Sequence, residues 1–107
     1  MTIERNTPLD ATIEYVRFET TDPAKLTAQR DRLISLLRER YGNDFLGAHL
    51  AHCEDGSLLD LILWASPEAA ARAAREMPAE PGVAGFFSLI GEVHEMRHAR
   101  VLHSTQP

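Results

Sequence analysis

The chain has 107 residues, 44% of them apolar and 25% charged, which fits one ordinary globular domain and leaves little room for a second core. The net charge of -5 argues against a nucleic-acid partner, because phosphate binding needs clustered Lys and Arg. No apolar run is long enough to span a bilayer, the first residues lack the features of a secretory signal, and the one cysteine, Cys53, has no partner for an internal disulfide. A single domain in the reducing cytoplasm is expected.

The first half of the chain predicts an arm, a strand and a helix. Residues 1–11 have no sustained period and contain Pro8, so they are interpreted as an N-terminal arm. Residues 12–20 alternate and are rich in β-branched and aromatic side chains, which is typical of a half-buried strand. Thr21 or Asp22 then caps a helix in which Pro23 takes the first position. Its buried stripe is formed by Leu26, Arg30, Leu33, Leu36, Leu37 and Tyr41, and Gly42 ends it.

The second half predicts a hairpin, a second helix and a last strand. Residues 45–53 and 58–65 are apolar runs joined by an acidic-Gly turn, which indicates a β-hairpin. Ser66-Pro67 opens an Ala-rich helix that ends near Met77, a short helical turn follows at 83–89, and 91–103 is interpreted as a strand before a tail at 104–107. The order β-α-β-β-α-β predicts a ferredoxin-like α+β domain over 12–103, with a four-stranded antiparallel sheet and both helices on one face.

Alternation along the strands assigns residues to two sheet faces. The face expected under the helices is almost wholly apolar and carries Val16, Phe18, Leu46, Ala48, Leu50, Leu59, Leu61 and Leu63. The other face is mixed and carries Tyr15, Arg17, His49, Ala51, Cys53, Asp60, Ile62 and Trp64, joined by His94, Met96 and His98 if the last strand keeps its register. Because monomers rarely expose an apolar patch of that size, a homodimer that covers this face is predicted.

Four polar residues on the mixed face form the candidate site. His49 and Asp60 lie on the two arms of the hairpin and could act as a general base and its orienting partner, with Tyr15 and Arg17 beside them. The alternative is that these groups pair across a dimer interface and fix its register. Trp64 is more often a core or interface residue than a ligand-stacking one, and Phe86 more often fills the helix layer than lines a pocket, but both could be walls of a ligand pocket.

The segment His94-Glu95-Met96-Arg97-His98 matches the sequence pattern of the H-E-x-x-H zinc-protease motif. That motif works on a helix, where residues four apart share a face and can bind one ion. On the predicted strand the two histidines would sit roughly 13 Å apart, so no metal site is expected. Residues 91–103 could still be helical, and the choice between strand and helix is left open.

The chain resembles the antibiotic biosynthesis monooxygenase-like group of dimeric α+β barrels over about residues 12–103. The resemblance is carried by the element order, by Phe45-Leu46-Gly47 and by the junction Leu63-Trp64-Ala65-Ser66-Pro67-Glu68-Ala69-Ala70. It implies oxidation of a small phenol or quinol by O₂ without a cofactor, with His49 and Asp60 as base and positioning group. Tyr15, Arg17, Trp64 and Phe86 would then contact the substrate.

Similar barrels also serve as haem-degrading enzymes and as binding proteins, so the resemblance identifies a fold better than an activity. The haem-degrading pattern is not followed, because the first strand has no Asn, the second helix has no Trp and no His lies between His52 and His94. A non-catalytic module that binds a small ligand or a partner is the alternative function. The identity of the substrate cannot be predicted.

Overall fold

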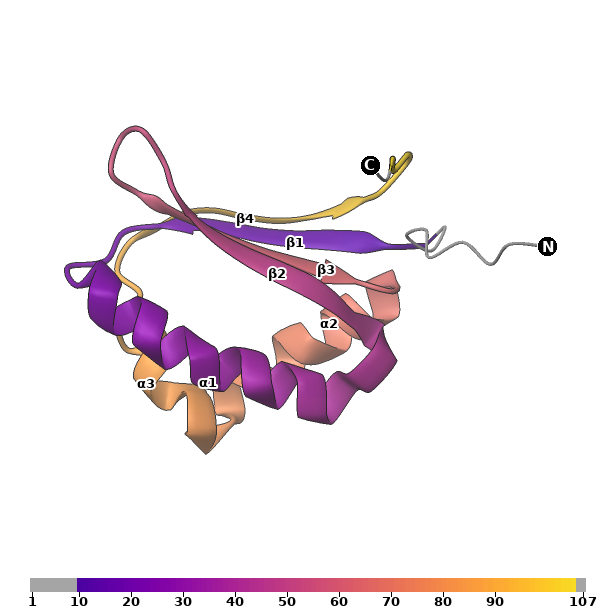
Figure 1. The fold of residues 1–107 in the computed structure, drawn as a ribbon, viewed down its shortest axis with the longest axis horizontal. Coiled ribbons are helices and arrows are strands. Elements are labelled where there is room, and N and C mark those ends of the chain that lie inside the picture. The colour runs from indigo at the N-terminus through magenta and orange to yellow at the C-terminus, as the bar shows by residue number, and fades with distance from the viewer. Residues whose placement is uncertain (1–9, 106–107) are drawn as a thin grey trace.

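The computed structural model describes residues 10–105, so most of the expected N-terminal arm and the last two residues of the tail lie outside the described part. Four strands pair in the order β2-β3-β1-β4, all antiparallel, and the helices cover one face of the sheet (Figure 1). The ferredoxin-like prediction is confirmed. The elements are β1 (Thr12–Phe18), α1 (Pro23–Tyr41), β2 (Phe45–His52), β3 (Leu58–Trp64), α2 (Pro67–Glu76), α3 (Ala84–Phe87) and β4 (Val93–Arg100).

Local sequence explains where the two long helices begin. The side chain of Asp22 accepts a hydrogen bond from the backbone N–H of Lys25 at 3.0 Å, which selects Asp22 over Thr21 as the cap of α1. Ser66 caps α2 in the same way, by accepting the N–H of Ala69 at 3.1 Å. Each helix has proline at its start, where the missing N–H loses no bond.

The segment that carries His94 and His98 is a strand, β4, at one edge of the sheet. Its register against β1 shifts once, because Phe18 faces Val93 while Arg17 faces Glu95, and this leaves His94 as an extra residue in a bulge. The same register places His98 opposite Glu14 and Met96 opposite Val16. Since Val16 faces the helices, the prediction that Met96 and His98 lie on the uncovered face is wrong.

The structure also reverses the predicted faces of β3. Its register against β1 places Leu59 opposite Arg17, Leu61 opposite Tyr15 and Leu63 opposite Ile13, on the sheet face that no helix covers. Asp60, Ile62 and Trp64 therefore face the helices, with Val16 and Phe18. The prediction put the leucines inside because they are the more apolar set, but a cation on α1 makes the inward carboxylate tolerable. The uncovered side of the sheet, here called the open face, consequently carries the leucines.

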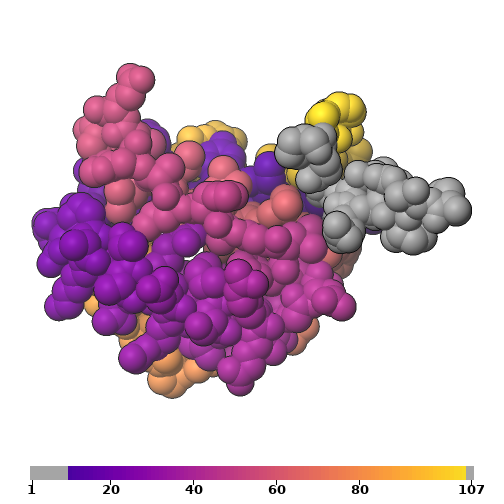
Figure 2. Space-filling model, in the orientation of Figure 1, coloured from indigo at the N-terminus to yellow at the C-terminus, as the bar shows by residue number. Residues whose placement is uncertain are grey.

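Trp64 anchors the packing of the helices on the sheet. Its side chain is 1% exposed, and its ring meets the rings of Tyr41 at 5.3 Å and Phe45 at 5.8 Å, both edge to face. These contacts tie β3 to the end of α1 and the start of β2. The β2–β3 hairpin projects from one end of the molecule beyond this core (Figures 1 and 2). Among the helices of residues 10–105, none combines the length and apolar character needed to cross a membrane.

Candidate functional site

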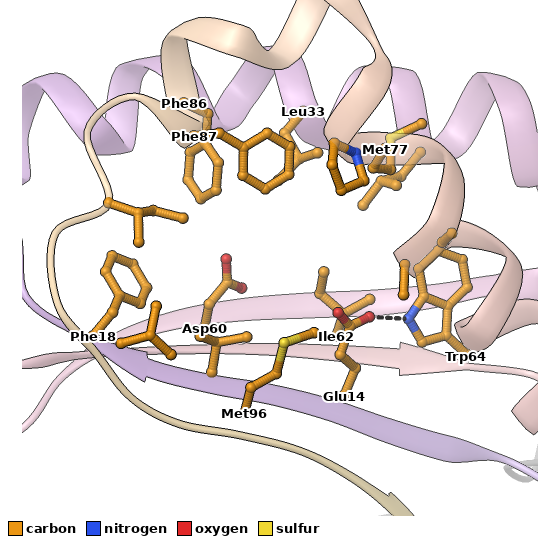
Figure 3. Close-up of a pocket in the computed structure, with 17 residues that line it drawn as sticks. Glu14, Phe18, Leu33, Asp60, Ile62, Trp64, Met77, Phe86, Phe87 and Met96 are labelled. Atoms are coloured by element: carbon orange, nitrogen blue, oxygen red, sulfur yellow. Dashed lines mark hydrogen bonds between the residues drawn. The ribbon is translucent and has the colours of Figure 1, made fainter.

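A cavity of about 330 Å³ lies between the sheet and the helices (Figure 3). The sheet supplies its floor from β1, β3 and β4, and α1, α2 and α3 with the turns between them supply the roof. Most of the lining is apolar or aromatic, including Leu33, Met77, Phe86, Phe87 and Met96. Two carboxylates, Glu14 and Asp60, interrupt this apolar lining. Such a cavity, mostly apolar with a few convergent polar groups, is the usual form of a small-molecule site.

Asp60 forms an ion pair with Arg30 of α1, the helix that covers this part of the sheet. Arg30 on α1 donates from Nη2 to Oδ1 at 2.6 Å and from Nε to Oδ2 at 3.4 Å. The two side chains are 11% and 8% exposed, so the pair is largely removed from water. Both carboxylate oxygens are engaged, which fixes the carboxyl group on the cavity floor as an acceptor for a ligand's hydroxyl or N–H.

Glu14 has a different environment, because no cation among residues 10–105 bonds to it. Its Oε1 accepts the indole N–H of Trp64 at 2.9 Å (Figure 3). Burial raises the pKa of Glu14 above 4.5, the bond from Trp64 and the nearby His98 lower it in part, and the charge of Asp60 raises it further. Glu14 therefore binds a proton more readily than a glutamate in water.

The structure separates His49 from Asp60. In the β2–β3 register His49 lies opposite Leu61, whereas Asp60 lies opposite Leu50, so the two side chains project to opposite faces of the sheet. The prediction that the hairpin brings them together on one face is wrong. Its cause is the reversed assignment of β3, because His49 lies on the open face as predicted whereas Asp60 faces the helices. His49 is exposed and does not line the cavity.

Tyr15 and Arg17 also lie on the open face, away from the cavity. The hydroxyl of Tyr15 donates to Oε2 of Glu95 at 3.1 Å, and Arg97 donates to the same oxygen at 2.6 Å. Arg17 approaches Asp55 in the hairpin turn at 3.5 Å. Polar groups of the chain itself thus engage both residues.

Trp64 and Phe86 do line the cavity, together with Asp60, so three of the six predicted site residues share one space. Sequence reasoning missed Glu14 and Arg30 as parts of the site. Glu14 has the same parity along β1 as Val16 and Phe18, and Arg30 lies within the apolar stripe of α1, so the signals were present. Each was a charged residue at a position that its neighbours mark as facing inward.

Within residues 10–105, no three His, Cys, Asp or Glu side chains gather in a way that could hold a metal ion. His94 instead contacts Glu19, with Nε2 and Oε2 2.6 Å apart, and lies 3.8 Å from Glu92. The H-E-x-x-H sequence at His94–His98 therefore lies on a strand and lacks the helical arrangement on which the zinc-protease motif depends.

No family model and no curated protein sequence matches the chain. Solved structures do match. The oxygenase SnoaB from Streptomyces nogalater, described as cofactor-independent, superposes with a TM-score of 0.65 at 17% identity, covering 91% of this chain and 96% of that one. A candidate antibiotic biosynthesis monooxygenase from Caulobacter crescentus gives 0.69 at 12% identity, covering 89% and 92%.

A third structure is a dimeric ferredoxin-like protein from an uncultured marine organism. It gives a TM-score of 0.67 at 11% identity and covers 96% of this chain and 97% of that one. The resemblance to the antibiotic biosynthesis monooxygenase-like barrels is therefore confirmed at the level of fold. At these identities the likeness extends to the fold alone.

The environment of Glu14 predicts how stability depends on pH. Because its pKa is higher in the folded protein than the ordinary 4.5, the stabilisation from its bound proton is present below that value and is lost as the pH rises through the folded pKa. In Glu14→Gln the amide keeps an acceptor for Trp64 and has no proton to lose. The variant should therefore gain stability relative to wild type with rising pH, as measured by urea unfolding at a series of pH values. A stability difference that stays constant across the series would contradict this environment.

Proposed function

We propose that the chain is a cofactor-independent monooxygenase-like protein that acts on a small aromatic substrate of the phenol or quinol type. The site is the cavity between the sheet and the helices. The fold supports the proposal because SnoaB, a structure of the same architecture, is a cofactor-independent oxygenase. The observation that carries it is the cavity itself, an aromatic and apolar space with two carboxylates on its floor.

The lining suits a flat, electron-rich ring. Trp64, Phe86 and Phe87 offer aromatic surfaces, and the remaining walls are aliphatic. A volume of about 330 Å³ lies within the range of small-molecule pockets. Asp60, fixed by Arg30, would accept a hydrogen bond from a ring hydroxyl and so orient the ligand.

The chemistry requires the protein to remove one proton from the hydroxyl group. The electron pair stays on the oxygen, and the resulting phenolate is a stronger reductant than the phenol. In a phenol or naphthol with hydrogen at the para position, oxidation of that position then consumes one O₂: one oxygen atom becomes the new carbonyl of the quinone and the other leaves as water. In a quinol, whose para position already carries oxygen, the same balance applies at another ring C–H and gives a hydroxyquinone and water. The substrate supplies all four electrons, so the balance needs no other reductant.

A second candidate is a module that binds a small ligand without changing it. It is favoured by the engagement of Asp60, whose two oxygens both accept hydrogen bonds from Arg30. The same cavity would then bind an aromatic compound through shape and one hydrogen bond. Oxygen uptake distinguishes the two candidates, because only the enzyme consumes O₂.

We also infer that the protein is a homodimer joined through the open face. Leu59, Leu61 and Leu63 lie in a row there, each half-buried in the single chain, with Tyr15 beside them. A row of leucines along the middle of a sheet is a costly surface for a monomer, and a twofold copy is the commonest way to cover one. The dimeric ferredoxin-like relative in fold supports this inference.

The pocket proposal predicts that Ala74→Phe abolishes ligand binding. Ala74 lines the cavity, so an added ring fills the space that the ligand needs. Binding of 1-naphthol can be followed by the indole N–H resonance of Trp64, the only tryptophan in the chain. Oxygen uptake with a panel of hydroquinones and naphthols, in buffer that contains a metal chelator, gives the activity.

The matched control is Ala28→Phe on the exposed side of α1, which should keep both binding and uptake. Binding by Ala74→Phe at wild-type affinity would remove the cavity from the proposal. Binding by the wild type with no uptake for any member of the panel would favour the non-catalytic module.

The dimer proposal predicts that Leu61→Asp dissociates the protein. Leu61 lies on the open face of β3, which the sheet order places between β1 and β2 inside the sheet, and a carboxylate buried there without a partner opposes association. Sedimentation equilibrium should give about twice 12.0 kDa for wild type and for the control Ala28→Asp, and 12.0 kDa for Leu61→Asp. A stable 12.0 kDa wild type at micromolar concentration would contradict the dimer.

A further inference from the structure

The two carboxylates on the cavity floor differ in which of their oxygens are already bonded. Asp60 uses both oxygens to accept hydrogen bonds from Arg30 in a largely buried ion pair. Glu14 bonds only through Oε1, to the neutral N–H of Trp64. Among residues 10–105, no group donates a hydrogen bond to Oε2 of Glu14. Since every fully buried side-chain oxygen in this part of the chain has a hydrogen-bond partner, Oε2 is not fully buried. It is the free acceptor on the floor.

Glu14 also stands where a proton could leave the cavity. On one side its strand neighbour is Ile62 of β3, and on the other it is His98 of β4. Directly paired residues of antiparallel strands have Cβ atoms about 5 Å apart and project to the same face. His98 is exposed and belongs to the edge strand, so its imidazole lies beside Glu14 and is open to solvent.

Imidazole is the side chain best suited to pass a proton at neutral pH, because its ordinary pKa lies close to 7. The charged or titratable groups that the structure places around Glu14 are Asp60 on β3, with Arg30 behind it on α1, and His98 on β4. The part of the roof formed by Ala73, Ala74 and Met77 is apolar. His98 is therefore the titratable group beside Glu14 that is itself exposed to bulk water.

We propose that Glu14 is the catalytic base of the cavity and that His98 carries the proton from it to solvent. The proposal rests on the function proposed above. The O–H bond of the ring hydroxyl breaks, the proton binds Oε2 of Glu14 and the electron pair remains on the ligand as phenolate. The proton then passes to the imidazole, directly or through one water, and on to bulk water, which restores the carboxylate.

Burial strengthens Glu14 for this role. A base works best when its pKa approaches the working pH, and desolvation raises the pKa of Glu14 in that direction. Since Glu14 must be ionised to accept the proton, kcat/KM should rise with pH through this raised pKa. That acid limb should vanish when the carboxylate is removed.

The test is turnover of the most active hydroquinone or naphthol of the panel by Glu14→Gln and His98→Ala. Glu14→Gln should lose about 100-fold or more in kcat and lose the acid limb, while 1-naphthol still shifts the Trp64 resonance. His98→Ala should lose turnover severalfold in dilute buffer, and added imidazole should restore it. A residue with a merely structural role would not respond to imidazole. His103→Ala, an exposed histidine beyond β4, is the matched control and should behave as wild type.

Three results would overturn the proposal: a Glu14→Gln variant that keeps its turnover, a His98→Ala defect that imidazole leaves unchanged, or the same defect in His103→Ala. If Glu14→Gln fails to fold, the His98→Ala measurement still tests the proposal, because His98 is exposed and its replacement should not disturb the core. If the wild type consumes no O₂ with any member of the panel, the proposed oxygenase function fails and this inference falls with it. Wild-type turnover with unaffected variants refutes the inference alone.

Discussion

The ion pair between Arg30 and Asp60 is the constraint on which the rest of the structure depends. It bridges α1 and β3 at 2.6 Å, with both side chains almost fully removed from water. A buried carboxylate without such a partner is strongly unfavourable, and removing one member of a buried pair typically costs about 3–5 kcal/mol. The pair makes an inward-facing Asp60 possible, and alternation along β3 then fixes the direction of every other side chain on that strand.

Two surfaces with different roles follow from this one choice of face. On the helix side, Ile62 and Trp64 join Asp60, and with Glu14 on the neighbouring strand they form the floor of the cavity. On the open side, Leu59, Leu61 and Leu63 form an apolar row that a second copy would cover. Had β3 faced the other way, the leucines would fill the space under the helices and the carboxylate would lie on the open face. The cavity and the apolar row of the open face thus arise from the same register.

Much of the fold was predictable from local signals. Asp22, Ser66 and the prolines that follow them mark the helix starts, and the acidic-Gly turn marks the hairpin, because these residues act through bonds within a few positions. The faces of β3 were not predictable from β3 alone. The more apolar set of alternate residues on β3, its leucines, lies on the open face. The cause lies on α1, where Arg30 interrupts the apolar stripe and pairs with the inward-facing Asp60.

The candidate site shows the same division between local and distant causes. Trp64 and Asp60 were predicted to share one face of the sheet and do so, but His49 was paired with Asp60 because the faces of β3 were assigned from the apolar parity of β3 alone. Glu14 was missed because a glutamate in a strand is ordinarily expected to face water. An inward carboxylate is informative only once the residues above it are known.

A crystal structure of the protein with bound 1-naphthol tests the account most directly. The account predicts the ring between the sheet and the helices, beside Trp64 and Phe86, with its hydroxyl within hydrogen-bond distance of Glu14 or Asp60. A ring bound on the open face beside His49, with the cavity unoccupied, would contradict it.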